Sequence, residues 1–473
     1  MDLDRRAFSR RQFLTRNAWA VGLALAACSA PSAPQQGAAP QPAAQPTTPP
    51  AAAPTTAAAA ATPATQAAAA SPGVFNVWFS ANWNEITDKA VGDTFVEWGN
   101  TKNVKVEWQS IPGSPQQLAK ESAALAAGQP PELNNANRTY WYSQGEMADL
   151  KDLVNKFKDL AGGMYEIGIS SNAVADGAII GAPYAIDVWP AHWRMDLIGP
   201  ATGGRFFDTY EELIQLGPKI QQPPRTYLYA MALGHEGDHM NNMPTVLWAY
   251  GGRIADEKGV PDIKNPANKA GIQTIVDMWK AKLIPPDTFA QTVTSWNNET
   301  YQKGRGLMAI NPATIMGWLL VNDQELGDKT GLSLPPKGSA GSFAEGASIA
   351  FNYYKKAPLA NMAPSSLEFF MQPDKLEAIS KSVEGRFVPV YRDHAKTEFW
   401  TSSKFAELKK IAEFGRIREY PAAPTAWLSD VTDAKYVFSD MIQKVINDNM
   451  AIEDAQAWAQ QQMMDSYNKV QKA

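Results

Sequence analysis

A stretch of 45 residues without a single charge, from position 29 to position 73, restricts what this chain can fold into. It holds 19 Ala and 10 Pro, and the remainder is Ser, Thr, Gln and two Gly. This composition lacks the large apolar side chains that a core requires, so we expect a disordered, extended tether over 29–73. A folded body must then be built from the roughly 400 residues that begin at Val74, which are enough for two lobes instead of one core.

The first 28 residues have the layout of an export signal. Paired arginines in Ser9-Arg10-Arg11-Gln12-Phe13-Leu14 precede a short apolar run from Ala18 to Ala27. The pair resembles a twin-arginine signal, and the run is too short to remain as a membrane-spanning helix. Leu25-Ala26-Ala27-Cys28 resembles a lipobox, which predicts lipidation of Cys28. We therefore expect a lipoprotein on the outer face of the cytoplasmic membrane, in the periplasmic or extracytoplasmic space.

Charge and cysteine usage exclude several classes of function. Cys28 is the only cysteine, so the mature chain has neither a disulfide nor a thiol nucleophile. The whole chain has a net charge of −5 and residues 1–28 carry +3, which leaves −8 on the mature protein. An acidic surface argues against nucleic acid or anionic lipid as the partner.

Hydrophobic periodicity predicts an α/β fold. Strands are expected at 74–79 and 104–108, each followed by a helix, at 85–99 and 115–127. Asp208 or Thr209 is expected to cap the helix that follows it. Further helices are predicted at the following positions: 266–282, 408–414, 436–446 and 452–470.

Five short motifs occur in order along the mature chain, each of them weak by itself. They are LAKESAALAAGQPPEL at 118–133, GEMADL at 145–150, DGAIIGAPY at 176–184, YQKGRGLMAIN at 301–311, and the pair LPPKG at 334–338 with IEDA at 452–455. Together they resemble the extracellular solute-binding proteins of sugar importers, the maltose-binding-protein-like family known as solute-binding protein family 1. Glu132 stands where that family usually has Asp, and Met147 where it has Leu.

The resemblance implies a two-lobed periplasmic-binding-protein fold of the class II type, in which each lobe is a mainly parallel sheet flanked by helices, with extra C-terminal helices. Lobe 1 would comprise 74–186 and about 311–357, and lobe 2 would comprise 187–310 and about 358–473. The chain would cross between lobes near 182–187, near 310–314 and again after Gly346.

The same resemblance implies a binding protein and not an enzyme. A sugar or oligosaccharide would be held in the cleft between the lobes and passed to the permease subunits of an ABC importer. The protein would be a monomer, would need no cofactor and no metal, and would bind no nucleic acid.

Tryptophans and amides in predicted loops are the candidate ligand residues. Fifteen tryptophans are present, and five of them are expected in loops, at 83, 189, 193, 296 and 427. A sugar offers apolar C–H faces and a ring of hydroxyls, which suit aromatic platforms and planar polar side chains. By resemblance, Asp187 stands where the family places a carboxylate that binds sugar hydroxyls. The complete candidate set is Trp83, Asn135, Asn137, Arg138, Asp187, Trp189, Asn241, Asn242, Asn311, Thr314, Trp318, Glu345 and Trp427.

Three alternatives remain open. His235-Glu236-Gly237-Asp238-His239 matches the H-E-x-x-H zinc motif, which would suit a secreted zinc-dependent hydrolase. Gly237 within the motif and Pro244 behind it argue against the regular helix that this chemistry needs. A surface glycan-binding lectin would share the anchor and the aromatic residues without a permease. Arg138 and Arg386 could each pair with a carboxylate, so a uronic acid ligand also remains open.

Overall fold

A computed structural model describes residues 73–471, except for 83–84, 112–113, 241, 293–294 and 383–384. The predicted export signal, the predicted lipidation of Cys28 and the predicted tether up to position 72 therefore lie outside the described residues. The same holds for two of the candidate ligand residues, Trp83 and Asn241.

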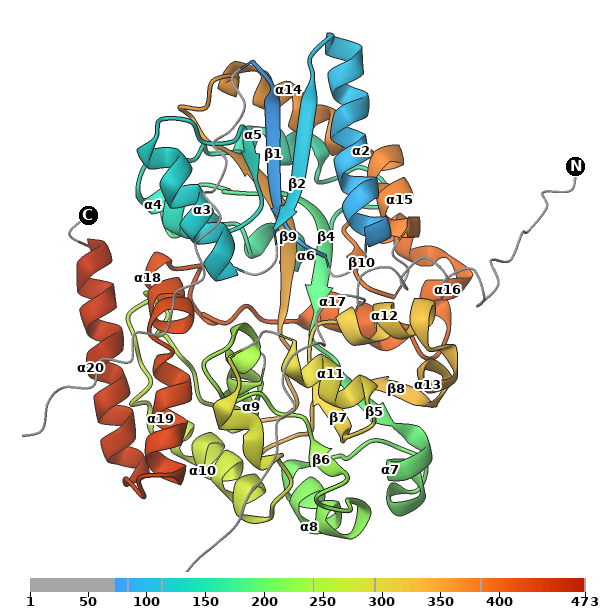
Figure 1. Ribbon diagram of the computed structural model, residues 1–473, viewed down its shortest axis with the longest axis vertical. Coiled ribbons are helices and arrows are strands. Elements are labelled where there is room, and N and C mark those ends of the chain that lie inside the picture. Colours follow the sequence, from blue (N-terminus) through green and yellow to red (C-terminus); the bar gives the residue numbers. More distant parts are fainter. Residues whose placement is uncertain are drawn as a thin grey trace, which may run out of the picture. The chain divides into compact units, whose positions relative to one another are not determined.

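The first sheet contains six strands in the order β10-β4-β9-β3-β1-β2 (Figure 1). The strands are Phe75–Ser80 (β1), Val106–Ile111 (β2), Leu133–Asn134 (β3), Ala182–Val188 (β4), Gly346–Tyr353 (β9) and Val388–Pro389 (β10). β1 pairs in parallel with β2 and β3. β9 runs antiparallel to β3 and β4, and β10 runs antiparallel to β4.

The second sheet contains four strands in the order β6-β7-β5-β8. They are Ala191–Arg194 (β5), Tyr227–Tyr229 (β6), Gly306–Ile310 (β7) and Thr330–Ser333 (β8). Only β6 and β7 pair in parallel, while β5 is antiparallel to both β7 and β8.

Both sheets are mixed, which corrects the expectation of mainly parallel sheets. Successive strand–helix–strand units give parallel pairs through crossover connections, and β1, β2 and β3 follow that rule. β9 and β10 reach the first sheet only after the chain has passed through the second sheet. Their direction is therefore not set by a local crossover, and local sequence patterns do not reveal it.

Helices flank the first sheet, and the three that were predicted, at 85–99, 115–127 and 408–414, begin within two residues of the predicted positions. The flanking helices are α2 (Glu85–Lys102), α3 (Ser114–Ala126), α4 (Arg138–Ser143), α5 (Lys151–Phe157), α6 (Glu166–Ser170), α14 (Ala363–Phe370), α15 (Pro373–Ser382), α16 (Glu398–Thr401) and α17 (Ala406–Phe414). Both α14 and α15 contact α2 (Figure 1).

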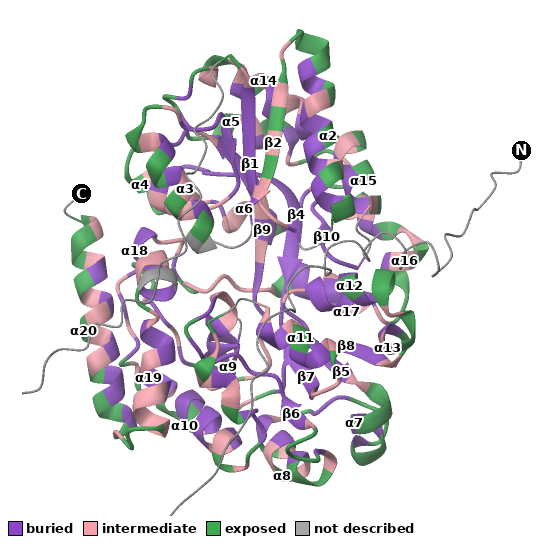
Figure 2. Ribbon diagram, in the orientation of Figure 1, coloured by how far each residue is buried: buried purple, intermediate pink, exposed green. Residues whose placement is uncertain are grey.

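The core of the first lobe forms between these helices and the strands. Phe95 of α2 stacks on Phe370 of α14 with ring centroids 4.4 Å apart, and meets Phe351 of β9 edge-on at 5.1 Å. Every residue of β1 is buried except the last, which is half-buried. The edge strand β2 instead alternates between intermediate and exposed positions before its buried last residue (Figure 2). We use the name first lobe for the part of the chain that packs on this core.

Helices of the second lobe surround the second sheet. They are α7 (Met195–Thr202), α8 (Tyr210–Ile220), α9 (Met243–Ala249), α10 (Pro266–Lys280), α11 (Trp296–Gln302), α18 (Ala426–Ser429), α19 (Val437–Ile446) and α20 (Ile452–Gln471), and α12 (Thr314–Asn322) and α13 (Gln324–Lys329) lie between β7 and β8 in the chain. Thr209 caps α8, as predicted, because its side chain accepts a 3.0 Å hydrogen bond from the backbone N–H of Glu212. The predicted C-terminal helices are confirmed as α19 and α20.

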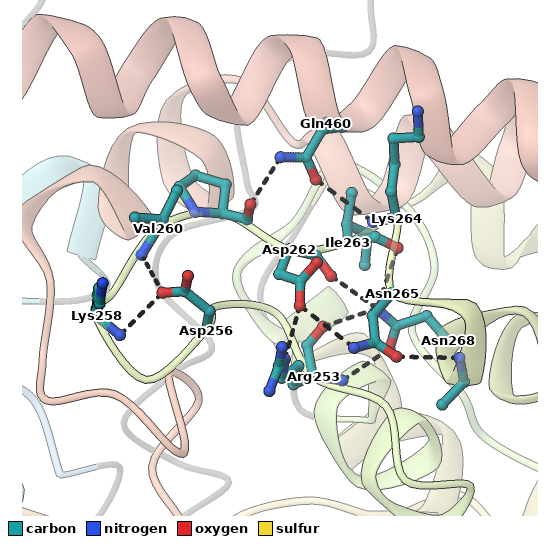
Figure 3. A network of polar contacts seen from close by, with 12 residues as sticks. Arg253, Asp256, Lys258, Val260, Asp262, Ile263, Lys264, Asn265, Asn268 and Gln460 are labelled. Atoms are coloured by element: carbon teal, nitrogen blue, oxygen red, sulfur yellow. Dashed lines mark hydrogen bonds and ion pairs between the residues drawn. The ribbon is translucent and has the colours of Figure 1, made fainter.

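A polar network fixes the long C-terminal helix to the loop that precedes α10 (Figure 3). Gln460 of α20 donates from Nε2 to the carbonyl of Pro261 at 2.7 Å. Asn268 of α10 donates to the carbonyl of Ile263 at 3.0 Å and accepts from the backbone N–H of Arg253 at 2.8 Å. The loop thus satisfies its polar groups through two helices, which makes α20 an integral part of the second lobe.

Within the described residues, the chain crosses between the two cores at three places, which are joined to one another by backbone hydrogen bonds. The first crossing follows β4, where the N–H of Trp189 donates to the carbonyl of Glu345 at 3.0 Å. The second crossing leads into β9 at Gly346, whose N–H donates to the carbonyl of Arg416 at 3.0 Å. The third crossing contains Arg416 itself, whose N–H donates to Ala344 at 3.1 Å.

Two expected lobe boundaries differ from these positions. The crossing expected near 310–314 is not found among the described residues, because the next strand, β8, pairs with β5 in the second sheet, although Ala313, Met316 and Leu332 also pack on the first core. Residues 358–412 do not join the second lobe, since Ala363, Leu367 and Ala412 belong to the first core. Pairing between distant segments, such as that of β8 with β5 and of β10 with β4, leaves no local mark in the sequence. None of the helices within the described part of the chain is both long and apolar enough to cross a membrane.

Candidate functional site

A cavity of about 300 Å³ lies where the three crossings meet the ends of strands from both sheets. The residues that line it are Ser80, Ala81, Asn82, Asn135, Asp187, Trp189, Gly237, Asp238, Ser295, Asn298, Asn311, Pro312, Thr314, Ile349, Arg386 and Arg418. Amides, hydroxyls and charged groups dominate this set. We call it the cleft.

The first lobe contributes loops at the carboxyl ends of β1 and β3, where ligands of α/β sheets bind. Asn135 follows β3, and its Oδ1 accepts a 2.8 Å hydrogen bond from the N–H of Ser80 at the end of β1. Asn82 is held in turn by Asp88 of α2, which accepts from its backbone N–H at 2.9 Å and from its Nδ2 at 2.7 Å. These bonds fix the loops before any ligand arrives.

An ion pair between Asp187 and Arg386 forms one wall of the cleft. The two guanidinium nitrogens of Arg386 lie 2.5 Å and 3.1 Å from the two carboxylate oxygens of Asp187. Only 6% and 7% of their side-chain surfaces remain exposed. Arg386 also lies over the ring of Phe387, with its guanidinium carbon 3.8 Å from the ring centroid. The pair is thus bidentate, buried and rigidly placed.

A second ion pair lies at the crossings. Arg418 lines the cleft, and its Nε donates to Oε1 of Glu345 at 2.7 Å. Burial raises the pKa of Glu345 to about 7, although Arg418 acts in the opposite direction. The guanidinium of Arg418 lies 6.0 Å from the ring of Trp189, which is 8% exposed and supplies the aromatic surface of the cleft.

The second lobe contributes a chain of hydrogen-bonded amides. Asn311 follows β7, and its Oδ1 accepts from Nδ2 of Asn297 at 2.8 Å. Its own Nδ2 donates to Asn298 of α11, and Nδ2 of Asn298 lies 3.4 Å from Oγ1 of Thr314. Such a network presents both donors and acceptors at fixed positions, which is what a polyol requires.

The segment that matches the zinc motif does not form the helix which that chemistry needs. Residues 237–240 form a single turn of 3₁₀ helix. His235 points to Asp440 on α19, with a nitrogen–oxygen distance of 2.6 Å, while Nδ1 of His239 lies 2.7 Å from the carbonyl of Glu236. Burial lowers the pKa of His239 to about 4 and raises that of Glu236 to about 9. Within the described residues, no group of three or more His, Cys, Asp or Glu side chains is arranged to hold a metal ion.

Five of the candidate ligand residues are brought together in the cleft. They are Asn135, Asp187, Trp189, Asn311 and Thr314. All five lie after a strand or near its end. That position directed the prediction to Asn135, Asn311 and Thr314, whereas Asp187 was inferred from the family resemblance and Trp189 from its place in a predicted loop.

Six other candidates do not line the cleft, and most of them have structural partners instead. Arg138 donates to Asn172 at 2.9 Å, and Asn137 donates to Glu121 at 3.2 Å. Asn242 is fully buried and accepts from the hydroxyl of Tyr229. The other three are Trp318, Glu345 and Trp427.

Each of these last three differs from the prediction for its own reason. Trp427 is buried in the second core, and its Nε1 donates to the carbonyl of Gly259 at 2.9 Å. Trp318 lies one turn beyond Thr314 on α12 and is 37% exposed. Glu345 does not line the cleft itself, but its carboxylate binds Arg418, which does.

Several lining residues were not in the candidate set, and those with polar side chains are Ser80, Asn82, Asp238, Ser295, Asn298, Arg386 and Arg418. Arg386 precedes a strand of only two residues, and Arg418 lies in an irregular crossing, so neither follows a recognisable strand. Of the five tryptophans expected in loops, Trp193 lies in β5, and Trp296 and Trp427 lie in helices. Arg386 was named from the sequence only as a possible partner of a ligand carboxylate, and no local pattern marks Arg418.

Solved structures with the same fold bind small polyhydroxylated molecules. A sugar transporter from Arthrobacter chlorophenolicus with bound laminaribiose is 15% identical, with a TM-score of 0.70, over 83% of this chain and 99% of that one. A solute-binding protein from Thermotoga lettingae with α-D-tagatose is 16% identical, with a TM-score of 0.71, over 83% and 99%. One from Agrobacterium radiobacter with ribitol is 16% identical, with a TM-score of 0.68, over 83% and 98%.

These similarities establish the fold of the chain. At such low identity they say nothing about its individual residues, and no family model matches the sequence. The α/β, two-lobed architecture of ABC-transporter solute-binding proteins, predicted from five weak motifs, is confirmed.

Proposed function

We propose that this protein is a solute-binding receptor which holds a sugar or polyol in the cleft. The observation that carries the proposal is the lining itself, in which amides, hydroxyls and a bidentate ion pair from both lobes surround Trp189. Ligand contacts would come from Asn135, Asp187, Asn311 and Thr314 together with the tryptophan. No bond of the ligand would be made or broken.

The size of the cavity supports a small ligand. Sites for small molecules commonly enclose about 300–1,000 Å³, and the cleft, at about 300 Å³, lies at the lower end of that range. A mono- or disaccharide or a linear polyol fits this volume better than a long oligosaccharide. The ligands named for the three solved structures fall in the same classes.

Intrinsic fluorescence tests the proposal directly, because Trp189 lies in the cleft. The purified protein is titrated with a panel of monosaccharides, disaccharides and linear polyols. A saturable change in emission with at least one of them is the expected result. If no member of the panel gives a saturable response by fluorescence or calorimetry, the proposal is wrong.

We propose further that the receptor is anchored by a lipid on Cys28 and delivers its ligand to an ABC permease. The support is the export and lipobox pattern of residues 1–28 together with the resemblance of the mature chain. Replacing Cys28 by Ala should release the protein from membrane fractions of the producing cell while ligand affinity stays unchanged. A lectin without a permease would keep the binding but give no ligand uptake in cells.

A further inference from the structure

The guanidinium of Arg386 is already bound by a carboxylate of the protein. Both of its terminal nitrogens lie within 3.1 Å of Asp187, and its Nε lies 3.4 Å from the carbonyl of Asn82. Bidentate pairing is the same geometry with which arginine recognises the carboxylate of a ligand. Asp187 therefore occupies the position that an acidic ligand would need.

The second arginine of the cleft is engaged in a similar way. Glu345 accepts from Nε of Arg418 at 2.7 Å, and only 4% of the Glu345 side chain is exposed. The backbone carbonyl of Glu345 accepts from the N–H of Trp189 as well, so the carboxylate is held by the crossing itself. Each cleft arginine thus has its own buried carboxylate.

Among the described lining residues, no net positive charge remains for an anion. Asp238 adds a further carboxylate to the lining, which otherwise consists of amides, hydroxyls and apolar groups. An acidic ligand would have to give up its hydration and approach Asp187 and Asp238 without gaining an uncompensated cation. Transfer of an unpaired charge from water into a protein site is costly. A neutral ligand meets no such penalty.

We propose that Asp187 and Glu345 make the cleft selective for uncharged polyhydroxylated ligands, because they neutralise two arginines that would otherwise bind the carboxylate of a uronic acid. This inference rests on the proposed function and narrows its ligand class. Glu345 acts as a positioning residue through Arg418, whereas Asp187 lines the cleft itself.

Calorimetric titration of the wild-type protein gives the first test. A neutral sugar that binds is compared at pH 8 with its uronic acid of the same stereochemistry, for example glucose with glucuronate or galactose with galacturonate. The uronate is expected to bind at least tenfold more weakly. Equal or tighter binding of the uronate overturns the selectivity but leaves the proposed function intact. Absence of binding by every sugar and every uronate overturns both.

Two variants test which residues cause the selectivity. Asp187→Asn and Glu345→Gln each free one arginine from its carboxylate, and in each variant the preference for the neutral sugar should fall at least tenfold. Glu121→Gln is the matched control, since Glu121 is also a buried carboxylate but does not line the cleft. A preference unchanged in both folded variants contradicts the assignment. If Asp187→Asn fails to fold, Glu345→Gln and the wild-type comparison decide.

Discussion

The carboxylate of Glu121 lies in the interior of the first lobe. One oxygen accepts from Nε1 of Trp141 at 2.6 Å and from Asn137 at 3.2 Å. The other oxygen has no hydrogen-bond partner among the described residues. Burial raises the pKa of Glu121 to about 7, against the opposing effect of these hydrogen bonds. The ionised carboxylate is therefore more costly in the folded chain than in the unfolded chain.

The pH dependence of stability follows from this shift. Between pH 4.5 and about 7 the folded state binds the proton more tightly, so the free energy of unfolding falls as the pH rises through this window. Glu121→Gln removes the charge and should raise the free energy of unfolding at pH 8 by roughly 2–3 kcal/mol. At pH 4.5 the variant should differ little from wild type. Urea unfolding at the two pH values measures the difference, and an equal effect at both would contradict the assignment.

Two tryptophans from the candidate set allow a matched test of the site. Trp189 lines the cleft, whereas Trp318 is exposed on α12. Trp189→Phe keeps an aromatic body but shortens the platform, so ligand affinity should fall about tenfold, or about 1.4 kcal/mol, and most of the fluorescence response should disappear. Trp318→Phe should change neither. The opposite pattern would remove Trp189 from the proposed site.

The candidate residues that line the cleft share one feature: they stand after a strand or near its end. Asn135 and Asn311 were predicted from that position, because the rule that ligands bind at carboxyl ends of strands is local enough to apply from sequence, whereas Asp187 was inferred from the family resemblance. Arg386 and Arg418 were not among the candidate ligand residues, because no local pattern shows that their segments approach the cleft. Asn242 does not line the cleft and instead accepts a hydrogen bond from Tyr229, because a polar residue in a predicted loop can equally be a buried hydrogen-bond partner.

At the level of elements, the longer helices with clear hydrophobic spacing were predictable and the strand pairing was not. The hydrophobic spacing of α2, α10 and α20 arises within each segment, so their ends were placed within a few residues. β9 pairs with β3 and β4 from a position more than 150 residues further along the chain. Such a contact depends on the whole fold, which explains why both the strand directions and two lobe boundaries differed from expectation.

A prediction at the level of elements concerns Gly415, which follows the last residue of α17 and lies in the third crossing. A Cβ added there would lie 2.6 Å from the carbonyl oxygen of Ile411 and 3.3 Å from Gly346 on the neighbouring crossing. Gly415→Ala must therefore displace backbone, which should lower the free energy of unfolding by about 1–3 kcal/mol. Because Arg418 follows closely, ligand affinity should fall as well.

Gly327→Ala is the control for this substitution. Gly327 lies within α13, and its added Cβ would have its nearest neighbour at 3.6 Å, an ordinary contact distance. Alanine in a helix interior stabilises relative to glycine, by up to about 1 kcal/mol. Urea unfolding of both variants measures the contrast. Equal effects of the two substitutions would show that the close approach of the crossings is not a constraint.

At the scale of the whole molecule, a ligand bound in the cleft would connect two lobes that have separate cores. The cleft takes Asn135 and Asp187 from the first lobe and Asn311 and Thr314 from the second. The covalent links between the cores are three crossings, which are hydrogen-bonded to one another. A ligand that contacts both walls therefore adds non-covalent connections between lobes, and closure about these crossings is the motion such an arrangement allows.

Thermal unfolding should report this linkage. A ligand at a hundred times its Kd adds about 2.7 kcal/mol to the folded state. With an unfolding entropy of about 2.1 cal/mol/K per residue over roughly 400 residues, the Tm should rise by about 3 °C. Because residues of both lobes would contact the ligand, the unfolding transitions of the two lobes should shift together in calorimetry. A sugar that gives no fluorescence response should leave the Tm unchanged. If the unfolding splits into two transitions of which the ligand shifts only one, a single lobe holds the ligand and the cleft is not the binding site that we propose.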